Sequence, residues 1–192
     1  MIDLITKSQI RKNILLLLFS NQNESFYINQ IARLIKTSSG NVQRELRNLE
    51  KAGILLKEKK GNLSYFRVNV DSSLFSDIKG VIDKTIGIKY ILETTFSKEK
   101  SIDFAFIFGS YAKGEFKSDS DIDLYIIGSI NEEDLHRLVR GAEEKIYREI
   151  NYHLSDGKEF KEKAKKSFFH KQILEHFIII KGDENEFREL IK

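Results

Sequence analysis

The stretch of residues 109–124, GSYAKGEFKSDSDIDL, decides how the second half of the chain is interpreted. An almost uninterrupted apolar run at residues 102–108 precedes it, and a second apolar run at residues 124–127 closes it. Short apolar runs bounded by glycine and polar residues are typical of strands that are covered on both faces. The stretch therefore predicts two buried strands, joined by a Gly-Ser turn, a short helix and a polar loop.

Two carboxylates stand where the second of these strands begins. Asp121 and Asp123 are two residues apart, so their side chains lie on the same face of an extended strand. Adjacent carboxylates repel each other, and both stay ionised at neutral pH most easily when a cation lies between them. Carboxylate oxygens suit Mg²⁺ or Mn²⁺, which proteins bind through a few carboxylates and the phosphates of a substrate. Gly109 lets a phosphate approach the backbone closely, and Ser110 supplies a hydroxyl and an amide donor.

Residues 109–124 resemble the signature of the polymerase-β-type nucleotidyltransferases, especially the minimal nucleotidyltransferases of bacteria and archaea. The resemblance implies that Gly109 and Ser110 bind nucleotide phosphates, and that Asp121 and Asp123 are catalytic residues holding divalent ions. It also implies the reaction: a hydroxyl attacks the α-phosphate of a nucleoside triphosphate, with ATP as the expected nucleotide, and pyrophosphate leaves.

This family carries a third carboxylate on a later strand, where it is often the base for the attacking hydroxyl. After a helix expected at residues 132–147, the strand expected at residues 149–154 has Glu149, Asn151 and His153 on one face. The third position falls best on Asn151, which can offer a carbonyl oxygen to a metal but cannot accept a proton. Glu149 or His153, two residues away on the same face, are the alternatives. A long helix at residues 160–177, a short strand and a last helix are expected to complete the scaffold.

The first half of the chain differs in charge and pattern. Residues 1–88 have a net charge of +6 and residues 89–192 one of −3. Apolar spacing predicts helices from Ser8, from Ile28 and from about Asn41, and two extended runs follow Gly53. This succession resembles the winged helix-turn-helix of small bacterial and archaeal regulators over about residues 7–70, which carry a net charge of +8.

In such regulators the third helix enters the major groove and the hairpin contacts the DNA backbone. The resemblance implies that double-stranded DNA is a partner and that the chain forms a homodimer, which reads two half-sites. The residues placed on DNA lie on the third helix and at the hairpin tip: Gln43, Arg44, Arg47, Lys59 and Lys60. A winged helix that serves dimerisation or protein contact is the open alternative.

The sequence as a whole predicts an α/β (α+β) protein of two domains. Residues 1–88 are expected to form the winged helix with a connecting helix, and residues 89–192 a small mixed-sheet nucleotidyltransferase domain with flanking helices. The absence of cysteine excludes disulfides, thiolate zinc sites and cysteine nucleophiles. No apolar run is long enough to span a bilayer or form a secretory signal, so a cytoplasmic protein is expected.

Three functions are open on this evidence. The first is an enzyme that transfers a nucleoside monophosphate to a hydroxyl of a small molecule or protein, coupled to a DNA-binding winged helix. The second is a DNA-binding transcriptional regulator whose second domain senses nucleotide without turnover. The third is an interaction module with neither activity.

Overall fold

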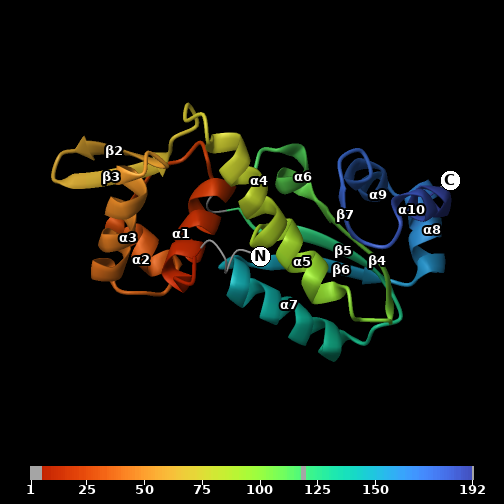
Figure 1. The fold of residues 1–192 in the computed structure, drawn as a ribbon. Helices are drawn as coiled ribbons and strands as arrows, with labels where there is room; N and C mark the ends of the chain where they lie inside the picture. Colours follow the sequence, from red (N-terminus) through yellow and green to blue (C-terminus); the bar gives the residue numbers. More distant parts are fainter. Residues whose placement is uncertain (1–5, 118–119, 192) are drawn as a thin grey trace. The chain divides into compact units, whose positions relative to one another are not determined.

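The computed structural model describes residues 6–117 and 120–191. The chain divides into two compact units, between Tyr90 and Ile91 (Figure 1). Each unit has its own sheet, of three strands in the first and four in the second, which confirms the predicted mixed α/β fold class. No helix in the described ranges is long and apolar enough to cross a membrane. The assignment of residues 1–88 and 89–192 to two functional domains stays a prediction.

The first unit contains the expected helices and hairpin. Its elements are α1 (Gln9–Ser20), β1 (Phe26–Tyr27), α2 (Ile28–Leu34), α3 (Ser39–Lys51), β2 (Leu55–Lys60), β3 (Leu63–Val68) and α4 (Phe75–Thr85). The strands are antiparallel in the order β1-β3-β2, and Gly61 turns the β2–β3 hairpin in the left-handed region, at φ +59°. Fully buried Leu18, Ile31 and Leu46 join the first three helices in one core.

One face of α3 is buried in the core and the other is exposed to solvent. Val42, Leu46 and Leu49 are buried at spacings of four and three residues, as an amphipathic helix requires. Glu45 is also buried, and its carboxylate accepts a hydrogen bond from Arg11 Nε on α1 at 2.8 Å. Because a buried carboxylate is costly unless it is paired, this ion pair fixes the orientation of α3 against α1.

The second unit is a mixed sheet with helices around it. Its elements are α5 (Ile88–Phe96, which spans the division), β4 (Ile102–Phe108), α6 (Gly109–Lys113), β5 (Ile122–Gly128), α7 (Glu132–Ile146), β6 (Ile150–Ser155), α8 (Gly157–Lys166), α9 (Phe168–Ile173), β7 (Ile178–Lys181) and α10 (Glu184–Leu190). The strand order is β6-β5-β4-β7; β4 is antiparallel to both of its neighbours, and β5 is parallel to β6. The parallel pair needs a crossover, and α7 supplies it.

The central strands have two different faces. Phe106 and Phe108 of β4 lie on the same face as Tyr125 of β5, and this face packs against Phe160 of α8 and Phe187 of α10. The opposite face is formed by buried aliphatic side chains, among them Ile107, Leu124 and Ile126. Asp123 belongs to the aromatic face, because it is two residues before Tyr125.

The expected single helix at residues 160–177 is wrong. Two helices, α8 and α9, occupy this region, and Ser167 separates them with an extended backbone at φ −86° and ψ 128°. The Ser167 amide still closes α8 by donating to the Lys163 carbonyl, at 2.8 Å, while its Oγ accepts from the His170 amide at 3.5 Å. The Ser167 side chain thus accepts a hydrogen bond from an amide in the first turn of α9, which makes Ser167 the N-cap of this second helix.

Candidate active site

Asp121, Asp123 and the Gly109-Ser110 turn lie at one end of the central strands of the second sheet. In the strand register Asp123 is paired with Phe108 on one side and with Asn151 on the other. Neighbouring strands lie about 4.8 Å apart, so these three residues form one row across β4, β5 and β6. Gly109 and Ser110 follow Phe108 directly and form the start of α6. The structure thus brings together the residues that the sequence predicts as phosphate and metal ligands.

The two carboxylates are close enough to influence each other. Burial raises the pKa of Asp123 above its ordinary value and the negative charge of Asp121 raises it further, while His153 opposes the shift. A divalent cation between them would relieve this repulsion, and two carboxylates with phosphate and water oxygens are an ordinary Mg²⁺ ligand set. Across residues 6–117 and 120–191, no group of three His, Cys, Asp or Glu side chains could hold a metal. The carboxylate oxygens of Asp121 and Asp123 are donors that fit such a cation, and phosphate oxygens are donors of the same kind.

Asn151 occupies the place beside the two aspartates. Its Nδ2 donates a hydrogen bond to Asp121 Oδ2 at 3.1 Å, and its backbone is in register with Asp123. Glu149 precedes β6; its carbonyl accepts from the Ile122 amide at 3.0 Å, and its side chain is exposed. Of these two candidates for the third position, Asn151 is the one that contacts the carboxylate pair.

Gly109 makes the close approach between β4 and Asp123 sterically feasible. Its φ is +70°, a region that favours glycine, and a Cβ atom at this position would clash with Asp123 Oδ2. The chain therefore passes directly against the carboxylate as it turns from β4 into α6. This contact leaves the Asp123 carboxylate beside the first turn of α6, where the Ser110 hydroxyl also lies.

Arg148 is a contributor that the sequence analysis missed. Its Nη1 donates to the carbonyls of Lys117, at 3.1 Å, and Ser120, at 3.3 Å, just before Asp121. Its guanidinium also lies 5.0 Å from the centre of the Phe116 ring, which packs on Tyr111 of α6. Arg148 thereby ties the polar loop to the start of β6. A single arginine between a helix and a strand gives no periodic signal in the sequence.

The first unit presents the residues that were predicted to contact DNA. Gln43, Arg44 and Arg47 are exposed on α3, and Lys59 and Lys60 are exposed at the end of β2. A polar hollow of about 520 Å³ lies between the starts of α2 and α3 and the hairpin, and its lining includes Ser39, Gly40, Gln43, Asn62 and Ser64. Lys60 pairs with Glu58 at 3.4 Å, so its charge is partly balanced.

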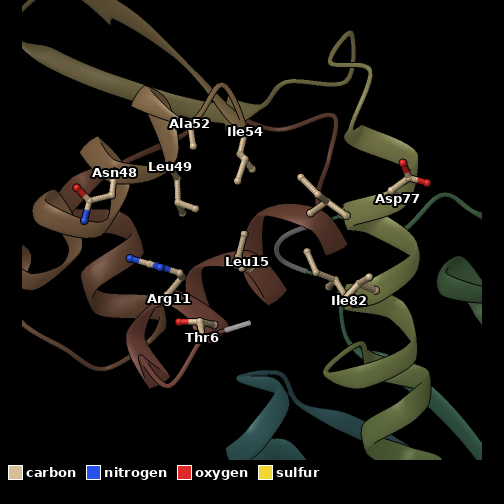
Figure 2. A pocket seen from close by; sticks show the side chains of 11 residues that line it. Thr6, Arg11, Leu15, Asn48, Leu49, Ala52, Ile54, Asp77 and Ile82 are labelled. Atoms are coloured by element: carbon tan, nitrogen blue, oxygen red, sulfur yellow. The ribbon is translucent and has the colours of Figure 1, made fainter. Parts of the chain in front are cut away.

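A second cavity in the same unit, of about 390 Å³, has a different character (Figure 2). It lies between α1, the end of α3 and α4, and is lined mainly by apolar side chains such as Leu15, Leu49 and Ile82. Arg11 lines it too, but its guanidinium is engaged by Glu45. None of the residues that the sequence predicts for DNA or nucleotide binding lines this cavity.

Two family models match the chain. Residues 91–185 match the family described as polymerase beta, nucleotidyltransferase, and residues 1–52 match the family described as EarA-like. Residues 91–185 form a polymerase β-type nucleotidyltransferase domain. The nucleotidyltransferase domain contains the whole row of Asp123, Phe108 and Asn151, together with Gly109, Ser110 and Asp121.

Several solved structures are similar to about half of the chain. One is the crystal structure of a toxin–antitoxin with AMP-PNP, to which the chain is 13% identical. The match covers 54% of this chain and 80% of the solved chain, with a TM-score of 0.42. The toxin–antitoxin MntA–HepT is 10% identical, with coverages of 54% and 78% and a TM-score of 0.37. The tri-AMPylated Shewanella oneidensis HEPN toxin in complex with MNT antitoxin is 11% identical, with coverages of 54% and 80% and a TM-score of 0.35. No curated protein matches the chain.

Substitution of Gly109 tests the contact with Asp123. Gly109→Ala is expected to lower stability by about 2–3 kcal/mol, because it adds a steric clash to the left-handed strain. Gly114→Ala is the matched control, since Gly114 has a φ of +76° but open space around its Cβ, so only about 1 kcal/mol is expected. Urea unfolding measures both. Equal losses for the two variants would contradict the contact.

Proposed function

We propose that the chain is a metal-dependent nucleotidyltransferase coupled to a DNA-binding winged helix. The observation that carries this proposal is the convergence of Asp121 and Asp123 beside the glycine turn at Gly109. The proposed ligands are ATP and Mg²⁺ or Mn²⁺, and the acceptor is a hydroxyl group on a small molecule or on a protein. The assignment of catalytic, metal and phosphate roles to individual residues is part of the proposal.

The chemistry follows from what each side chain can do. Asp121 and Asp123 would hold the cation, which neutralises charge on the triphosphate and makes the α-phosphorus a better electrophile. Gly109 allows the phosphates to approach the backbone, and the Ser110 hydroxyl donates to a phosphate oxygen. A bond forms between the acceptor oxygen and the α-phosphorus, and the bond from the α-phosphorus to the oxygen bridging the α- and β-phosphates breaks. The hydroxyl proton passes to water, and pyrophosphate leaves with the bridging oxygen.

A second candidate function is nucleotide sensing without turnover, and Asn151 favours it. An amide cannot take the proton from an attacking hydroxyl, and here its NH₂ group is engaged with Asp121. Such a domain would bind nucleotide and metal but leave the triphosphate intact. The chain would then act as a DNA-binding regulator that responds to nucleotide.

The winged-helix assignment is supported by three features of the first unit. Its helices α1, α2 and α3 are followed by the β2–β3 hairpin, its sequence is basic over residues 7–70, and α3 has an exposed face carrying Arg44 and Arg47. Side chains of this kind donate to phosphates or to base edges in a major groove. A homodimer would place two such helices on two half-sites.

Calorimetric titration with ATP and Mg²⁺ tests the nucleotide site. Asp121→Asn with Asp123→Asn is expected to weaken Mg²⁺-dependent ATP binding by at least about tenfold, because the cation loses both charged ligands. Glu133→Gln with Glu144→Gln is the control, since it removes the same charge from exposed positions of α7. Unchanged binding in the aspartate variant, or no binding by the wild type, would contradict the assignment.

The variant Asn151→Asp separates transfer from sensing. If the wild type only senses nucleotide, Asn151→Asp is expected to bind ATP as before and to release pyrophosphate at least about tenfold faster, since it gains a base. A pyrophosphate-release assay with Mg²⁺ measures the rate. A wild type that releases pyrophosphate readily, with no gain in the variant, would contradict the sensing function.

DNA binding is tested on the exposed face of α3. Arg44→Ala with Arg47→Ala is expected to weaken binding to a mixed-sequence duplex more than tenfold and to reduce the slope of log affinity against log salt by about 2. Lys79→Ala with Lys84→Ala removes the same charge from α4 and serves as the control. Equal losses in the two double variants, or a wild type that does not bind, would contradict the proposal.

A further inference from the structure

Three rings from distant parts of the second unit form a cluster beside the carboxylate pair; we name Phe108, His153 and Phe169 the aromatic shelf. The ring centres are 6.0 Å apart for Phe108 and His153, 5.9 Å for Phe108 and Phe169, and 5.2 Å for His153 and Phe169. These residues come from β4, β6 and α9. Each distance lies in the range in which aromatic rings attract each other.

The aromatic shelf is partly open to solvent. Phe108 is buried, but Phe169 is 38% exposed, and His153 lies exposed on the edge strand β6. The interior of a domain normally covers such rings, and an exposed pair of planar side chains beside a polar site is a surface on which another planar group can stack.

A buried hydrogen-bond network supports the shelf from below. The His153 ring stacks on Tyr125 at 5.7 Å and an interplanar angle of 20°. The Tyr125 hydroxyl donates to Ser155 Oγ at 3.3 Å and contacts His170 Nε2 at 2.9 Å. Tyr125 and His170 are both buried, so their hydrogen bonds hold the tyrosine ring, and with it the orientation of His153.

The aromatic shelf is next to the carboxylate pair in the strand register. Phe108 is the register partner of Asp123, and His153 is two residues beyond Asn151 on the same face of β6, about 7 Å along the strand. In a nucleoside triphosphate one ribose separates the base from the α-phosphate. A base on His153 and Phe169 would therefore leave the α-phosphate close to Asp121 and Asp123.

We propose that the aromatic shelf is the nucleobase subsite, in which His153 and Phe169 stack on the base of the bound nucleoside triphosphate. This inference rests on the proposed nucleotide function and adds the part of the ligand that the metal and phosphate residues do not contact. Stacking depends on ring area, so the shelf favours purine over pyrimidine nucleotides. Stacking alone does not distinguish adenine from guanine, so the shelf is expected to bind ATP and GTP with similar affinity.

Titration of the whole protein with two ligands tests the inference. ATP has a base and inorganic tripolyphosphate has none, and both are titrated in the presence of Mg²⁺. Phe169→Ala is expected to weaken ATP binding about tenfold, the range for loss of one stacking contact, and to leave tripolyphosphate binding unchanged. Phe168→Ala is the matched control, because this neighbouring ring is 81% exposed and lies outside the aromatic shelf; neither affinity is expected to change.

Three other outcomes would contradict the nucleobase subsite. If Phe169→Ala binds ATP as the wild type does, the nucleobase subsite is wrong and the nucleotide function stands. If the affinities for ATP and tripolyphosphate fall equally, Phe169 stabilises the fold and does not contact the base, which also overturns the inference. If the wild type binds neither ligand, the proposed function fails as well. Should Phe169→Ala not fold, Phe169→Leu, which keeps an apolar side chain but removes the ring, is expected to show the same split between the two ligands.

Discussion

The close contact between the Gly109 backbone and the Asp123 carboxylate is the constraint on which the rest of the site depends. The left-handed turn at Gly109 brings the end of β4 against β5, and a Cβ atom at this position would clash with the carboxylate in its present orientation. The result is a partly buried aspartate whose charge is disfavoured by its surroundings and by Asp121. A divalent cation would relieve this repulsion, and this supports the proposed cation and phosphate site.

Much of this site was predictable from the sequence, because it is encoded locally. The apolar runs around residues 109–124 predict the two strands, and the two-residue spacing predicts that Asp121 and Asp123 share a face. The place of Asn151 was also predicted, because the resemblance implies a third polar position on the strand after the helix. Its hydrogen bond to Asp121 was not, because it depends on the side-chain geometry of the folded site.

The parts that the sequence did not predict are formed by contacts between distant segments. The aromatic shelf joins residues 108, 153 and 169, and no local pattern relates these positions. Its last member depends on the break at Ser167, which starts α9 where apolar spacing favours one continuous helix. Arg148 is another such case, because the two carbonyls to which it donates hydrogen bonds are about thirty positions earlier in the chain.

The most direct test of the account is a crystal structure of the protein grown with Mn²⁺ and a non-hydrolysable ATP analogue, with the anomalous signal of manganese used to locate the ion. We expect an anomalous peak about 2 Å from carboxylate oxygens of both Asp121 and Asp123, with triphosphate oxygens completing the coordination. A nucleotide bound elsewhere, or manganese that contacts neither aspartate, would contradict it.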